Sequence, residues 1–462
     1  MTALHRLFAA IPAWLAGLTC ILVLWGGVLC GQGAGQAGKA KTEKAEAEKP
    51  AAEKAEKEGA EKAEAPAAKS AKPAPAADSG EKLEEQPAEA EKEAAPKEKP
   101  WKSLNVDEEQ KKNQSKVVTT ILRAGKFASD ADQDMVDAFY KTYFLPLATR
   151  PENLRELPRL RSTLRNHFSM TKAGATYDYL NALVLEYAEK TLAKDSAIHP
   201  AVRVNAVLMI GELSAAEPVR PVDPPDPCPE AAPVLLRLVE DSQQLEGMRV
   251  AALAGLVRHA RFGLHEAAVR NQVAAAMVKL LQSGKTEGRA DAALAWIPMQ
   301  AAEVLGLLGG AGNGSAIATE LAALAGNNRN PLIVRCAGAR ALGQLDLTGV
   351  GEALNPSKMA ADVGGLATDA AKDEIRSFNR RRLKTRLQAV LTGLKGSGER
   401  GTGIVKIATV EPHLSFVDKI RKPVAAMIEQ LDDKSAEDED LVAKLQPFCD
   451  KVENVLKTAP AN

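Results

Sequence analysis

The residue types that could do chemistry in this chain are scattered rather than grouped. Its histidines form no H-x-x-x-H pair, and His265-Glu266 lacks the second histidine with which a zinc hydrolase completes H-E-x-x-H on one helix. The cysteines beyond the N-terminal region have no spacing typical of metal ligands. A serine nucleophile elbow, a P-loop and a dinucleotide-binding glycine loop are also missing. We therefore predict no catalytic residue, no metal and no cofactor. The residues concerned are His167, His199, His259, His265, His413, Cys228, Cys336 and Cys449.

Three features have two interpretations each. Cys228 and Cys449 could form a disulfide in an oxidising compartment, or remain free. The basic run from Arg380 to Arg386 could contact an anionic surface, but we favour a solvated helix face paired with Asp373 and Glu374. The proline-rich segment 218–229 could dock on a partner or be a plain insertion.

Composition indicates which elements position these side chains. The chain has 462 residues and is only 4% aromatic, so Ala, Leu, Val and Ile must build the core. That composition favours packed helices over a sandwich or barrel. Lys and Arg number 60, as do Asp and Glu, and this balance argues against a nucleic-acid partner bound through phosphate neutralisation.

The N-terminal region, residues 1–38, reads as an export signal. His5 and Arg6 precede an uncharged stretch whose apolar part, within residues 7–29, just reaches the length of a membrane span. Two outcomes stay open: cleavage in the small-residue region 31–38, or retention as a membrane anchor. Lipidation is a third, for which Cys20 and Cys30 lack the small preceding residue that is needed. The expected location is extracytoplasmic, either anchored or secreted to the periplasm or beyond.

Residues 39–100 consist almost entirely of Ala, Glu, Lys and Pro. Leu83 is the only large apolar side chain, so this segment cannot bury enough surface to offset its chain entropy. We expect a disordered, stiffened linker that acts as a stalk, the alternative being a low-complexity tail without a role.

Four later segments share one helical pattern. An apolar column at Val202, Met248, Ile297 and Val334 is followed four residues later by a column of small residues, which lets a neighbouring helix approach closely. The segments lie 46, 49 and 37 residues apart, and an amphipathic stretch precedes each of them, so the unit is a helix–turn–helix. One such unit cannot bury its apolar face alone, and stacking buries it. The small column comprises Ala206, Ala252, Ala301 and Gly338.

The run from Pro200 to Ala206 and the run from Val334 to Leu345 resemble the second helix of HEAT repeats. The resemblance covers about residues 170–350. It departs from the family pattern where Pro298 replaces the arginine and Val257 the glycine. It implies an all-α fold, a right-handed α–α superhelix, and a structural role for three arginines in packing between repeats. These are Arg203, Arg249 and Arg335.

The remaining helical patterns complete the predicted organisation. We expect an N-terminal helical cap at 101–170, HEAT-like repeats at 171–350, a degenerate C-terminal repeat at 351–400 and a helical tail at 401–462. The function this implies is a non-enzymatic scaffold that binds a still unidentified protein on its solenoid surface. A structural component of the cell envelope and a lyase-type HEAT-like enzyme are the alternatives.

Overall fold

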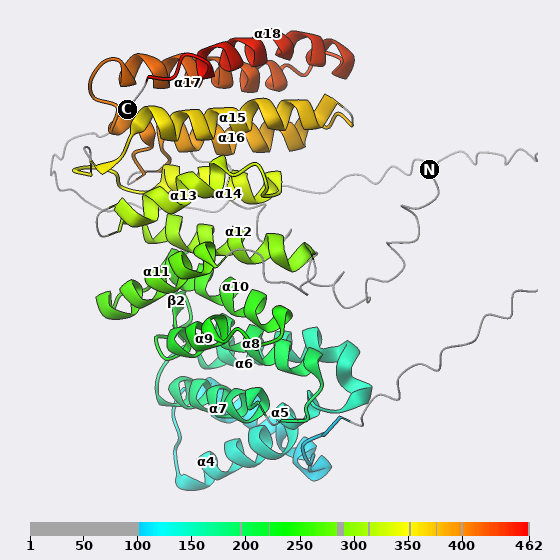
Figure 1. Ribbon diagram of the computed structural model, residues 1–462. Coiled ribbons are helices and arrows are strands. Elements are labelled where there is room, and N and C mark those ends of the chain that lie inside the picture. The colour runs from blue at the N-terminus through cyan, green and yellow to red at the C-terminus, as the bar shows by residue number, and fades with distance from the viewer. Residues whose placement is uncertain are drawn as a thin grey trace, which may run out of the picture. The chain divides into compact units, whose positions relative to one another are not determined.

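The chain folds into helices that pair and stack one pair upon the next (Figure 1). In this computed structural model the described residues are 101–460, except 195, 221, 284–290, 313–314, 351–352, 376 and 399–400. The predicted signal or anchor at 1–38 and the linker at 39–100 lie outside the described residues.

The N-terminal helices surround a small aromatic core. Phe139, Tyr140, Tyr143 and Phe144 follow one another on one helical stretch and are buried, which makes this the most aromatic part of the described chain. Two longer helical stretches, 130–147 and 157–171, lie in the region where the sequence predicts an N-terminal helical cap. The segments are η2 (Glu108–Asn113), α2 (Gln114–Lys116), η3 (Val117–Ile121), α3 (Leu122–Ala124), α4 (Asp130–Asp137), η4 (Ala138–Phe144), α5 (Leu145–Leu147), η5 (Pro151–Glu156) and α6 (Leu157–Thr171).

Five helix pairs follow, each with a first helix, A, and a second helix, B. Local signals set several boundaries. Pro200 starts one B helix, where its missing N–H is harmless, and the His199 ring accepts the Ala201 amide at 3.1 Å. The pairs are α7 (Ala175–Leu192) with α8 (Pro200–Glu212), α9 (Ala231–Glu240) with α10 (Glu246–Phe262), α11 (Ala267–Gln282) with α12 (Asp291–Leu308), α13 (Ala316–Gly326) with α14 (Leu332–Gln344), and α15 (Pro356–Ile375) with α16 (Arg380–Lys395).

The pairs stack in two rows. In the B row, α8, α10, α12, α14 and α16 each pack on the next, and in the A row α9, α11, α13 and α15 do the same. Val202, Met248, Ile297 and Val334, the apolar column of the sequence pattern, are buried in this stack. One helix differs from its pattern: α12 begins at Asp291 and continues through Pro298, so it is longer than the repeat segment that starts at Ile297.

In the last pair, α17 (His413–Asp432) and α18 (Asp438–Leu456), the two helices exchange rows: the first lies beside the B row and the second beside the A row. Helix α17 packs on both α16 and α15, whereas α18 packs on α15. His413 at the start of α17 contacts Ser357 at the start of α15, and Asp432 at its end contacts Lys384 near the start of α16. Helix α17 is therefore antiparallel to α16, although it lies beside the B row.

Strand content in the described residues is small. Strands β1 (Ser214–Ala216) and β2 (Asp226–Pro227) form one antiparallel hairpin, with Ser214 opposite Pro227. Strand β1 precedes the proline-rich segment 218–229, and β2 lies within it. A short 3-10 helix, η8 (Ile404–Lys406), interrupts the irregular connection before α17. The prediction of a helical fold class is thus confirmed, with this hairpin as an addition to it.

Candidate functional site

The three arginines of the repeat pattern make one recurring contact. Each lies near the start of a B helix and donates to a carbonyl in the last turn of the preceding A helix. Such carbonyls have no partner within their own helix, so a guanidinium donor satisfies them. The distances are 3.4 Å from Arg203 Nη2 to Leu192 O, 3.1 Å from Arg249 Nε to Val239 O, and 2.9 Å from Arg335 Nε to Ala325 O.

Two of these arginines also reach the next pair. Arg203 Nη2 lies 3.4 Å from Gln244 Oε1, before α10, and Arg335 Nη1 lies 2.8 Å from Asp369 Oδ2 on α15. The arginines therefore sit one to a pair along the stack. They do not converge on a single site.

The small-residue column lies where helices approach closely. Ala206, Ala252 and Ala301 are buried, as is Gly338. A Cβ at Gly338 would lie 3.0 Å from Leu321 O, so α14 crosses α13 almost at backbone contact. Other glycines do the same within the B row. A Cβ at Gly211 of α8 would lie 3.0 Å from the Cα of Gly255 on α10.

The three cysteines of the described residues, Cys228, Cys336 and Cys449, are free and buried, so Cys228 and Cys449 are not bonded to each other. Burial raises the pKa of the Cys228 thiol to about 12 and those of Cys336 and Cys449 to about 11. Because the thiolate is the reactive form, these side chains are poor nucleophiles. In the described part of the chain, no cluster of three or more His, Cys, Asp or Glu residues could hold a metal ion.

Two histidines have hydrogen-bonded partners that sequence reasoning did not find. Ser357 Oγ lies 2.7 Å from His413 Nδ1, and Tyr140 OH lies 2.7 Å from His167 Nδ1. Ser357 and Tyr140 are fully buried, so a substrate cannot reach either hydroxyl. Both pairs join helices far apart in sequence, and sequence spacing gives no signal for them.

The basic run on α16 is paired within the protein. Arg386 Nη1 lies 2.7 Å from Asp373 Oδ2 and 2.9 Å from Glu374 Oε1, and Arg382 Nε lies 2.5 Å from the same Glu374 oxygen. Arg380 contacts Asp438 at 3.1 Å, and Lys384 contacts Asp432. The pairing with Asp373 and Glu374 agrees with the favoured interpretation, but Glu374 is fully buried, so the helix face is not solvated at that point.

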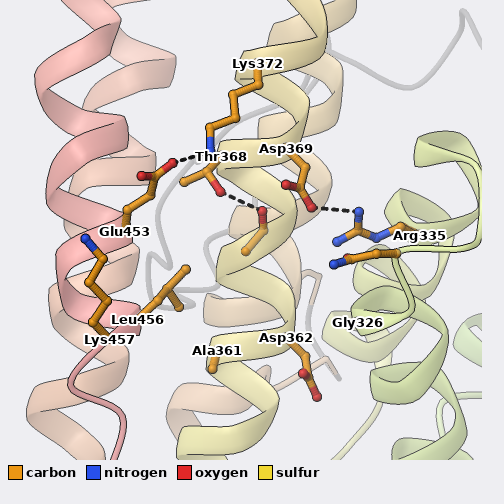
Figure 2. Close-up of a pocket in the computed structure, with 12 residues that line it drawn as sticks. Gly326, Arg335, Ala361, Asp362, Thr368, Asp369, Lys372, Glu453, Leu456 and Lys457 are labelled. Atoms are coloured by element: carbon orange, nitrogen blue, oxygen red, sulfur yellow. Dashed lines mark hydrogen bonds and ion pairs between the residues drawn. The ribbon is translucent and has the colours of Figure 1, made fainter.

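A polar pocket of about 390 Å³ opens between the end of α13, helix α15 and helix α18 (Figure 2). Ala361, Gly365 and Thr368 line it from α15. Four of its charged side chains pair with one another: Arg335 with Asp369 at 2.8 Å, and Lys372 with Glu453 at 2.6 Å (Figure 2). Both pairs join different helices, so we interpret the pocket as a junction between helix pairs.

The hairpin β1–β2 carries the most exposed apolar side chains among the described residues. Val219 is 95% exposed and Val222 is 83% exposed. The sequence drew attention to the segment through its prolines. In the sequence, the position of these two valines between prolines in an otherwise polar loop could have indicated their exposure.

No protein-family model matches the chain, and no curated protein sequence is significantly similar to it. Within the described part of the chain, no helix combines the length and the apolarity that crossing a membrane requires. The predicted attachment through residues 7–29 lies outside that part.

Proposed function

We propose that this protein is a non-enzymatic, extracytoplasmic scaffold of the HEAT type, which presents a solenoid surface to a protein partner. The recurring arginine contact supports the HEAT assignment, because one interaction repeated at successive pairs is what a stacked repeat array needs. In that assignment Arg203, Arg249 and Arg335 are structural residues, and the pairs form a right-handed superhelix. The N-terminal sequence supports export.

The observation that carries the binding role is the location of the exposed apolar side chains. We call the edge where B helices end and the next A helices begin the loop edge. Its loops hold Val219, Val222 and Val410, the three most exposed large apolar residues of the described chain. Loops on a rigid framework are where binding residues concentrate. Val219 and Val222 lie three positions apart in the same loop, and exposed apolar groups that lie together are typical of a protein-binding surface.

The test combines location with capture in the host cell. Fractionation of cells that express the full chain is expected to place it outside the cytoplasm. Chemical cross-linking followed by mass spectrometry is expected to recover one protein in stoichiometric amount. A full-length chain in the cytosol would contradict the location. Recovery of only the chain itself, or of glycan fragments, would contradict the scaffold and favour an envelope component or an enzyme.

A further inference from the structure

The tip of the β1–β2 hairpin combines exposed apolar side chains with an internal ion pair. We define the hairpin tip as residues 218–220 and 222–225. Single exposed apolar residues are normal on a protein surface. Two nearly fully exposed valines, three positions apart on one projection, are a concentrated apolar feature.

The turn at the hairpin tip is closed by one ion pair. The amide of Asp223 donates to Arg220 O at 3.0 Å, and the amide of Arg220 donates to the Asp223 carboxylate at 3.0 Å. The Arg220 guanidinium donates to the same carboxylate, with Nε at 3.0 Å and Nη2 at 2.6 Å from Oδ1. These contacts hold Arg220 and Asp223 together in the absence of a partner. Such restriction lowers the entropy cost of binding.

The base of the hairpin is fixed to three separate helices. Arg258 of α10 is buried and donates to Leu213 O and Ser214 Oγ, both at 2.7 Å. Asn181 of α7 donates to Ser214 O at 2.8 Å. The amide of Glu217 donates to Lys172 O, just after α6, at 2.8 Å. A buried guanidinium is costly unless it is well paired, and here all of its partners belong to the hairpin base or the end of α8.

The charge at the hairpin tip indicates which kind of partner it fits. Arg220 and Asp223 neutralise each other, so the hairpin tip offers two branched aliphatic side chains without net charge from this pair. An anionic membrane or a nucleic acid would be bound through unpaired cations, which this pair does not supply. A projecting apolar tip fits an apolar pocket on another protein.

We propose that the hairpin tip docks Val219 and Val222 into an uncharged apolar pocket of a protein partner. This inference rests on the proposed scaffold function, and it names the contact within the loop edge. Two valines supply only a part of the roughly 800 Å² that each side of a stable interface buries. The hairpin tip is therefore one anchor of a larger contact.

Site-specific photocross-linking in the host cell tests the proposal on the full chain. A photoreactive benzoylphenylalanine replaces Val222 in one variant and Ile333 in the other. Ile333 is 53% exposed and lies in the first turn of α14, at the opposite edge, so it is the matched control. We expect one adduct of defined mass from position 222 and none from position 333.

The adduct identifies the partner, whose affinity is then measured with purified variants. V219S/V222S is expected to weaken binding by about tenfold or more, and I333S by less than about twofold. D223A keeps both valines but opens the turn, so a smaller loss is expected. Because exposed side chains contribute little to folding, thermal unfolding of V219S/V222S should match that of the wild type. This control checks that the fold is intact.

The outcomes separate this inference from the scaffold function. A partner that cross-links from position 333 but not from position 222 overturns the hairpin contact and leaves the scaffold standing. No partner from either position, with none captured chemically, overturns both. Binding of the wild-type chain to phospholipid vesicles that is lost in V219S/V222S would assign the hairpin tip to a membrane surface instead.

Discussion

Arg335 of α14 lies 2.8 Å from Asp369 of α15, so a buried guanidinium in one helix pair is ion-paired with a carboxylate in the next. The same guanidinium donates to Ala325 O at the end of α13. One side chain thus joins three helices of two consecutive pairs. Its removal affects the packing within one pair and the packing between two pairs together.

Replacing Arg335 by Met should lower the free energy of unfolding by about 2–4 kcal/mol, because a helix-end carbonyl and a carboxylate both lose their donor. R335K should lose less, since an ammonium keeps the charge but not the forked geometry. Urea unfolding of the full chain measures both. R329A is the matched control, because Arg329 is exposed and its side chain makes no contact of this kind among the described residues. Equal losses in R335M and R329A would contradict the structural role of Arg335.

Alanine substitution at two glycines in neighbouring helices should change the stability of the protein in opposite directions. A Cβ at Gly343 of α14 would overlap the Thr392 carbonyl of α16, whereas at Gly365 of α15 it would meet nothing within 4 Å. G343A should therefore destabilise the protein by about 1–3 kcal/mol through overpacking. G365A should stabilise it by about 0.5–1 kcal/mol, because alanine is the better helix former. Thermal unfolding compares the two variants. A stabilising G343A would show that the B row is more loosely packed than described.

Stability should fall in acid because of two buried histidines. Burial lowers the pKa of His167 and of His259 to about 4, against about 6.5 in an unfolded chain. Between these values the unfolded chain binds more protons, so stability is fully present above about pH 6.5 and is lost as the pH falls towards 4. The loss is of the order of 3 kcal/mol for each histidine by pH 4.

His259 gives the sharper test of this pH dependence, because neither of its ring nitrogens has a hydrogen-bond partner in the described structure. H259L should reduce the difference in unfolding free energy between pH 7.5 and pH 4.5, measured in urea. An unchanged difference would show that His259 is hydrated or already charged at neutral pH. H265L is the control, since His265 is exposed.

The basic run on α16 should act on stability rather than on lipid binding. Glu374 is fully buried, and both Arg382 and Arg386 donate to it. R386A removes one of these donors and should cost about 1–3 kcal/mol. R381A should change little, because Arg381 is exposed. Flotation with anionic vesicles should not separate either variant from the wild type, and a loss of vesicle binding in R381A would restore the surface-contact interpretation.

The helices were predictable because their pattern is local. The i, i+4 and i+8 positions around Val202 and Val334 define a buried face within one helix, and Pro200 marks where that helix begins. The first contacts of Arg249 and Arg335 are local as well, since each donates to a carbonyl ten residues back along the chain. The contact of Arg335 with Asp369 depends on stacking, which no short segment encodes.

The features that sequence missed depend on long-range packing. Arg258 anchors a hairpin 44 residues earlier, and Ser357 meets His413 across 56 residues. The row exchange of α17 and α18 has no sequence signature either, because both helices show ordinary amphipathic faces. The prolines of segment 218–229 indicated an irregular segment, but the exposure of its valines follows from the anchoring of the base.

The exchanged rows of the final pair have a consequence for protein engineering. Helix α17 presents an antiparallel neighbour to α16, so a copy of a standard pair appended after α18 would not meet the parallel B-row surface against which such pairs pack. A longer platform is obtained by inserting whole units between existing ones, for example after α10 or α14. Such insertions keep a B-row neighbour on both sides of the new unit, and they leave the α17–α18 pair in place at the end of the array.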